Sequence, residues 1–85
     1  MLLQELIDDI NPIQIKGKID IEIDKIIYDS RQAENNSLFI CIEGFNVDGH
    51  SFIDKAIQSG AVAILIEKEL DEYKDNITYI KVSDT

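Results

Sequence analysis

The sequence predicts a small, single α/β domain in which a mixed or parallel sheet is flanked by helices. Three observations support this prediction. Two short, continuously apolar runs, residues 38–42 and 61–66, have the composition of strands that are covered on both faces. A helical pattern lies between them, so that strand, helix and strand span about 30 residues, the size of a βαβ unit. An alternating segment before this unit and an apolar run after it supply further strands.

The first expected element is a short amphipathic helix that Asn11-Pro12 ends. Its apolar residues recur at helical spacing: Leu2, Leu3, Leu6, Ile7 and Ile10. From residue 19 the period changes to two, because Ile19, Ile21 and Ile23 alternate with acidic residues. This alternation predicts a half-buried strand over residues 19–27, with residues 16–18 as the turn before it.

The helix inside the βαβ unit has a predicted beginning and end. Ser51 and Asp54 have the spacing of a capping box, and Gly60 can take the left-handed conformation that ends a helix. Its apolar stripe consists of Phe52, Ile53, Ala56 and Ile57. After the second buried strand, the charged residues 67–76 are expected to form a short exposed helix or a loop, and residues 77–82 a final strand.

Composition narrows the possible partners. The chain has 85 residues, of which 45% are hydrophobic and 29% charged, as in one folded domain. A formal net charge of -9 disfavours nucleic acid and anionic membranes, although local N–H groups and one arginine can still hold a single nucleotide. No apolar run approaches the ~20 residues of a membrane span, and the N-terminus lacks a signal peptide's basic start, so we expect a cytoplasmic protein.

Two polar loops directly follow apolar runs, at residues 29–31 and 43–50. Because the carboxyl ends of parallel strands meet at one edge of a sheet, where ligands commonly bind, the two loops predict a binding site. Asp29, Ser30 and Arg31 offer an acceptor, a hydroxyl and a guanidinium, which suit a polar heterocycle or an anionic oxygen. The same residues also fit an ordinary turn that Asp29 caps, and residue type alone favours that turn.

The second loop has its own pair of interpretations. Gly44 permits a tight bend and Asp48-Gly49 begins another turn, so the loop can present backbone amides and the ring of Phe45 to a flat ligand. It also fits a plain connection between strand and helix.

The sequence indicates binding rather than catalysis. His50 is the only histidine and has no partners at zinc-site spacing, so no metal site is predicted. Cys41 lies within an apolar run and is expected to pack as a small hydrophobe. The chain contains neither an evident nucleophile and base pair nor a glycine-rich phosphate loop followed by lysine, so no catalytic residue is predicted.

An ordered set of short blocks resembles the N-terminal domain of the Mur ligases. The blocks are Tyr28-Asp29-Ser30-Arg31, residues 37–44, residues 48–53, Ala56, residues 60–63 and Val82. Within this family the pattern most resembles the UDP-N-acetylmuramoyl-tripeptide synthetases. The ligases that add D-alanyl-D-alanine share much of it and are the alternative.

The resemblance implies that residues 1–85 are the UDP-substrate-binding N-terminal domain of a three-domain ligase, without its central ATP-binding and C-terminal domains. Such a domain holds the uridine end of UDP-N-acetylmuramoyl-L-alanyl-D-glutamate. By position the resemblance implicates Tyr28, Asp29, Ser30, Arg31, Gly44, Phe45, Asn46 and Val47. The parent enzyme is expected to use ATP and magnesium to attach diaminopimelate or lysine, and this chain alone to need no cofactor and to be inactive.

The expected partners are therefore the UDP-N-acetylmuramoyl-dipeptide and the remaining domains of the same ligase. The second hypothesis is a stand-alone, non-catalytic protein-interaction module that has the same fold and whose acidic surface contacts a basic partner.

Overall fold

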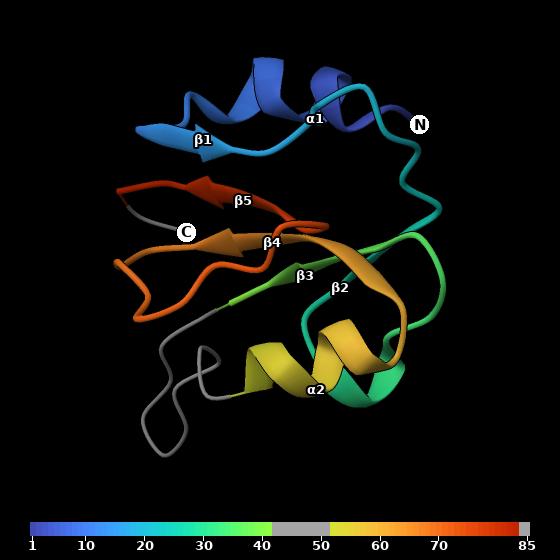
Figure 1. Cartoon of the computed structure of the whole chain (residues 1–85). Coiled ribbons are helices and arrows are strands. Elements are labelled where there is room, and N and C mark those ends of the chain that lie inside the picture. The colour runs from blue at the N-terminus through green and yellow to red at the C-terminus, as the bar shows by residue number, and fades with distance from the viewer. Residues whose placement is uncertain (42–51, 84–85) are drawn as a thin grey trace.

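The computed structural model describes residues 1–41 and 52–83. Within these ranges one five-stranded sheet has the strand order β1-β5-β4-β3-β2. Figure 1 shows α1 on one side of the sheet, and α2 with the short 3-10 helix η1 on the other. The elements are α1 (Leu3–Ile10), β1 (Gln14–Lys16), β2 (Lys25–Ile27), η1 (Ser30–Gln32), β3 (Ser37–Ile40), α2 (Ile53–Gln58), β4 (Ala61–Ile66) and β5 (Thr78–Lys81).

The sheet is mixed, which confirms the predicted α/β class. Strands β2, β3, β4 and β5 are parallel to one another, and β1 runs antiparallel to β5. The three apolar runs of the sequence became β3, β4 and β5, and β4 has the predicted bounds. The register shifts by one residue between β3 and β4, because Ser37 pairs with Ala61 while Leu38 pairs with Ala63.

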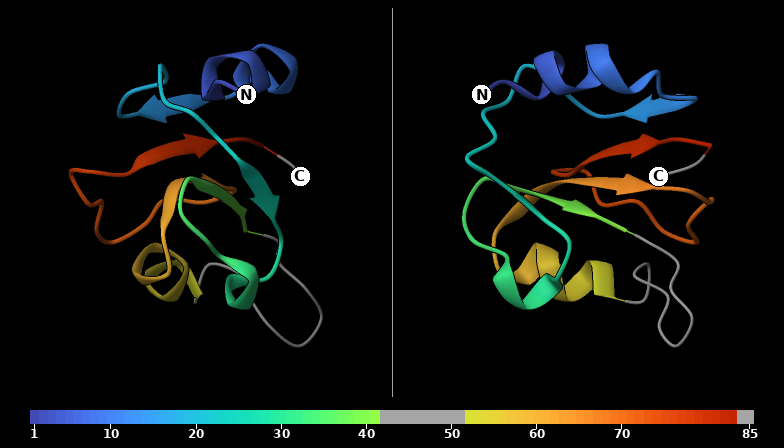
Figure 2. Two further views of the ribbon diagram at one scale, coloured as in Figure 1. Left: turned by 90° about the vertical axis from the view of Figure 1, so that its right-hand side faces the viewer. Right: turned by 180° about the vertical axis from the view of Figure 1, so that it is seen from behind.

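Each face of the sheet buries its own apolar cluster. Leu3 and Ile7 of α1 pack against Leu38 and Ile80 on one face. On the other face Ala56 of α2 belongs to the cluster around Phe39, Ile64 and Tyr79. The two turned views in Figure 2 agree that the helices lie on opposite sides of the sheet. Cys41 is fully buried in the cluster on the α2 face, which bears out its expected packing role.

The predicted strand over residues 19–27 is wrong in its first half. Only Lys25–Ile27 forms a strand, and within the described chain residues 19–23 contribute a single isolated bridge, between Glu22 and Leu2. The alternation of the isoleucines is nevertheless meaningful. Ile19, Ile21 and Ile23 all pack into the cluster beneath α1. A period of two therefore marked an extended, one-sided segment that pairs with no neighbouring strand.

This segment caps the first helix instead. The carbonyl oxygens of Ile21 and Ile19 accept hydrogen bonds from the backbone N–H groups of Leu3 (2.8 Å) and Gln4 (3.0 Å). Helix N–H groups at these positions have no partner inside the helix, and among the described residues α1 has no side-chain cap at Leu2. The extended segment thus supplies by main chain what a polar side chain supplies in most helices.

Strand β1 was not predicted, and Lys16, which we assigned to a turn, belongs to it. All three of its residues are exposed, so its sequence carries little apolar signal. Pairing with β5 and the position of the Lys16 ammonium, 4.6 Å from the centre of the Tyr73 ring, fix it in place. Tyr73 in turn packs edge-on against Tyr79, with ring centres 4.9 Å apart.

The remaining predicted boundaries agree with the structure. Asn11 takes the left-handed conformation (φ 57°) directly after α1, and Gly60 does so (φ 118°) after α2. The proposed capping box depends on Ser51, which lies outside the described residues. Residues 67–76, all described, contain neither a helix nor a strand, so they form the loop of the two expected alternatives. No helix in the described ranges is long and apolar enough to cross a membrane.

Candidate functional site

The strands that precede the two predicted loops are parallel neighbours. Ile27, the last residue of β2, pairs with Phe39 near the end of β3. The chain therefore leaves both strands at the same edge of the sheet, as the sequence predicted. The second loop lies outside the described residues, and with it the predicted site residues Gly44, Phe45, Asn46 and Val47.

A cavity of about 470 Å³ opens at this edge, and we call it the carboxyl-edge cavity. Its described lining consists of Tyr28, Asp29, Ser30, Arg31, Phe39, Phe52 and Lys55. All four residues of the predicted Tyr-Asp-Ser-Arg block are thus brought together. Phe39, Phe52 and Lys55 were not among the predicted site residues. The sequence places Phe52 and Lys55 three residues apart on one helical face, but it does not show that this face lies beside residues 28–31.

Asp29 and Arg31 form an ion pair with each other. The Asp29 carboxylate accepts a hydrogen bond from the backbone N–H of Arg31 (2.9 Å) and so caps η1. It also accepts from Nε (3.1 Å) and from the terminal nitrogen Nη2 (2.7 Å) of the same arginine. The Arg31 side chain and its backbone N–H together lower the Asp29 pKa from 3.8 to about 2. The structural turn that residue type favoured is therefore present, with Arg31 itself as the paired base.

Ser30 is positioned differently from its two neighbours. It is 5% exposed, and its backbone carbonyl accepts a hydrogen bond from the N–H of Ala33 (3.2 Å), which fixes the residue in η1. No described residue hydrogen-bonds to its hydroxyl. Among the described residues, every side-chain oxygen or nitrogen that is fully buried has a hydrogen-bond partner, so the Ser30 hydroxyl oxygen must be accessible to solvent. Ser30 therefore lines the cavity with a hydroxyl whose donor and acceptor capacity no described residue uses.

Aromatic rings supply the apolar part of the lining. Tyr28 is 65% exposed and Phe52 is 38% exposed, values that are high for rings of this size. Phe39 is buried and forms part of the core beneath the cavity. A cavity that combines exposed rings with a few convergent polar groups fits a ligand with one flat ring and polar edges.

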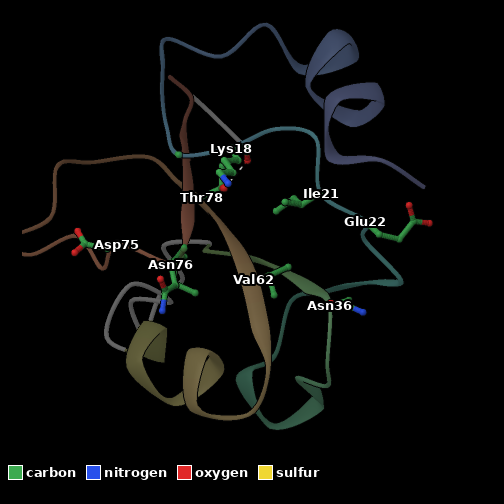
Figure 3. Close-up of a pocket in the computed structure, with 10 residues that line it drawn as sticks. Lys18, Ile21, Glu22, Asn36, Val62, Asp75, Asn76 and Thr78 are labelled. Atoms are coloured by element: carbon green, nitrogen blue, oxygen red, sulfur yellow. Dashed lines mark hydrogen bonds between the residues drawn. The ribbon is translucent and has the colours of Figure 1, made fainter.

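A second cavity, of about 500 Å³, lies at the opposite edge of the sheet, and we call it the amino-edge cavity. Residues before or at the start of β3, β4 and β5 line it, among them Asn36, Val62 and Thr78. In Figure 3 Lys18 and Thr78 lie next to each other, and the hydroxyl of Thr78 donates a hydrogen bond to the carbonyl of Lys18. No sequence motif predicted ligand binding here.

The described residues do not suit a metal ion. In residues 1–41 and 52–83 no three His, Cys, Asp or Glu side chains lie close enough together to hold one. Among the described residues that line the carboxyl-edge cavity, Asp29 carries the only carboxylate, and Arg31 already engages its oxygens.

Fold and cavity together define a small α/β domain with a cavity at the carboxyl ends of its parallel strands. Comparison with known proteins specifies the family. The family model described as "Mur ligase family, catalytic domain" matches residues 22–84. A UDP-N-acetylmuramoyl-L-alanyl-D-glutamate–2,6-diaminopimelate ligase of Alkaliphilus metalliredigens is 51% identical over 85 residues, which are all of this chain and 17% of that protein. The chain belongs to the Mur ligase family.

Other relatives agree with this assignment. A ligase with the same printed name from Clostridioides difficile is 42% identical over the whole chain, which covers 17% of that protein. Among solved structures, MurF from Acinetobacter baumannii superposes with a TM-score of 0.84 at 28% identity, over 99% of this chain and 18% of that chain. The chain therefore spans about a sixth of the length of the curated relatives that it matches.

Proposed function

We propose that residues 1–85 form the substrate-anchoring N-terminal domain of a peptidoglycan-precursor ligase. In this proposal the carboxyl-edge cavity binds the uridine end of UDP-N-acetylmuramoyl-L-alanyl-D-glutamate. The observation that carries the proposal is the Ser30 hydroxyl, which lies at a sheet edge beside exposed rings and has no hydrogen-bond partner among the described residues. An unused hydroxyl of this kind suits the donor and acceptor pattern along the edge of a uracil.

The other residues have supporting roles. The Asp29 and Arg31 pair closes the turn around Ser30 and so holds the backbone of that residue in place. Tyr28 offers a ring face to the nucleoside. Gly44, Phe45, Asn46 and Val47 complete the site in this proposal from the second loop, whose preceding strand ends at the same sheet edge.

The printed names of the relatives support a ligase that acts on the dipeptide substrate. The sequence relatives at 51% and 42% identity are named for 2,6-diaminopimelate, whereas MurF, the D-alanyl-D-alanine alternative, is represented by a solved structure at 28% identity. We therefore favour the ligase that adds diaminopimelate or lysine. No described feature favours the alternative of a protein-interaction module.

The chemistry of the parent ligase lies elsewhere in our proposal. ATP and magnesium are expected for a cytoplasmic parent enzyme that joins an amine to the glutamate carboxylate. The described residues of this chain provide no cluster of ligands that could hold magnesium. We assign both groups to the remaining domains of the parent, which are also the proposed covalent partners of this one, and we expect this chain alone to be inactive.

Calorimetric titration of UDP-N-acetylmuramoyl-L-alanyl-D-glutamate into this chain tests the proposal. We expect weak binding, because one wall of a site shared between domains leaves its contacts partly hydrated. Ser30→Ala should weaken binding about tenfold, through loss of the hydroxyl's hydrogen bonds. Ser59→Ala is the matched control, because Ser59 is exposed and does not line the cavity. Equal affinities for wild type and Ser30→Ala would contradict the role of Ser30.

A further inference from the structure

We infer that Lys55 is a binding residue for the diphosphate of a nucleoside diphosphate ligand, and that its ammonium makes the carboxyl-edge cavity attractive to an anion. This inference rests on the proposed function, because it takes the cavity to be the nucleotide site. It goes further in assigning the phosphate-binding role to a residue of α2 rather than to the Asp-Ser-Arg turn.

The first step is the balance of charges among the described residues that line the cavity. The described lining holds two cations, Arg31 and Lys55, and one anion, Asp29. Asp29 forms an ion pair with Arg31 at 2.7 Å, so the charges of that pair largely cancel as seen from a ligand. The Lys55 charge remains, and it gives the described part of the lining a positive balance within a chain of net charge -9.

The second step is that Lys55 differs from other lysines of the chain. Lys25, Lys74 and Lys81 pair with carboxylates, at 3.6, 3.9 and 3.0 Å respectively. Lys55 has no ion pair with any described residue. Its neighbour along the helix, Asp54, is instead the residue that lies 3.9 Å from the Lys74 ammonium. The ammonium of Lys55 is therefore available to a ligand.

The third step concerns the direction of the side chain. Lys55 lines the same cavity as Phe52, and it lies close enough to Asp29 to contribute to lowering the pKa of that carboxyl. Lys55 therefore lies near Asp29, in the cavity that Ser30 also lines. A nucleoside held by Ser30 would place the phosphates attached to its ribose within reach of a flexible lysine.

The experiment compares UDP affinity by calorimetry for wild type, Lys55→Gln and Lys55→Arg. Loss of the exposed charge should weaken UDP binding about three- to fivefold, and Lys55→Arg should restore it. Raising the salt concentration should weaken UDP binding to wild type and reduce its advantage over Lys55→Gln. Uridine, which has no phosphate, should bind wild type and Lys55→Gln equally well.

Lys18→Gln is the matched control. Lys18 is an exposed lysine at the amino-edge cavity, and its substitution removes the same charge from the chain. If it weakens UDP binding as much as Lys55→Gln does, the effect is one of net charge and the assignment is overturned. Equal UDP affinity for wild type and Lys55→Gln, with Ser30→Ala weakened, overturns the role of Lys55 and leaves the proposed function standing. Failure of wild type to bind UDP or uridine overturns both.

Discussion

The two ends of the parallel strands carry cavities of nearly equal size and opposite character. The carboxyl-edge cavity has about 470 Å³ and the amino-edge cavity about 500 Å³. At the amino edge the side chain of Thr78 is already bonded to the Lys18 carbonyl. At the carboxyl edge the Ser30 hydroxyl and the Lys55 ammonium have no such partner among the described residues.

Volume alone therefore does not distinguish the two edges, and we take the Ser30 hydroxyl, to which no described residue hydrogen-bonds, to mark the binding site at the carboxyl edge. Chain segments at the amino edge are closely packed against each other. Gly17 has φ 109°, and a Cβ there would come within 2.9 Å of the Thr78 main chain. The residues of this edge are constrained by close packing between chain segments, so we expect changes at the amino edge to alter stability and changes at the carboxyl edge to alter ligand binding.

The largest expected effect is that of Gly60→Ala, in the turn that precedes β4 at the amino edge. The residue has φ 118°, and an added Cβ would meet the backbone of Glu34 and Asn35 at 2.7 Å. We expect the free energy of unfolding to fall by about 3 kcal/mol in urea denaturation, because backbone must move to relieve the strain. Ser59→Ala, one residue earlier, should stay within about 0.5 kcal/mol of wild type. A stable Gly60→Ala variant would break the contrast between the edges.

A smaller effect is expected for Thr78→Val. The substitution keeps the shape of a buried side chain and removes the hydrogen bond to the Lys18 carbonyl. Thermal and urea denaturation should show a loss of about 1 kcal/mol. UDP affinity, measured at a temperature where both proteins are folded, should be unchanged. A weaker affinity for UDP would show that the amino-edge cavity communicates with the nucleotide site, contrary to the division proposed above.

The smallest effect on stability is expected at Asp29, and only in acid. Arg31 lowers the Asp29 pKa from 3.8 to about 2, so this carboxylate stabilises the fold above pH 3.8 and loses that contribution as the pH falls toward 2. Across this window the urea midpoint of wild type should fall more than that of Asp29→Asn, which has no charge to lose. Parallel curves for the two proteins would contradict the pairing of Asp29 with Arg31.

The sequence predicted those parts of the fold whose signals are local. Continuous apolar runs became central strands because both faces of β4 are covered, and Gly60 ended α2 because the turn requires a positive φ. Strand β1 could not be predicted, since its three exposed residues become a strand only by pairing with β5, which lies more than 60 residues further along the chain. The alternation in residues 19–23 correctly predicted the buried face and wrongly predicted the hydrogen-bonding partner.

The candidate site was predictable to a similar degree. Residues 28–31 follow a strand directly, so their place at the sheet edge followed from topology alone. Lys55 was overlooked because a lysine on an exposed helix face is common. Only the packing of α2 beside η1 brings it to the same cavity as Ser30.

The cap of α1 has a consequence for how this domain tolerates change. Most helices depend at their first turn on one serine, threonine or aspartate, which a single substitution can remove. Here the acceptors are the carbonyl oxygens of Ile19 and Ile21, which every amino acid possesses. Point substitution cannot delete them, so the start of α1 is buffered against mutation. An insertion or deletion within residues 19–23, by contrast, would move the acceptors out of register and leave the helix uncapped.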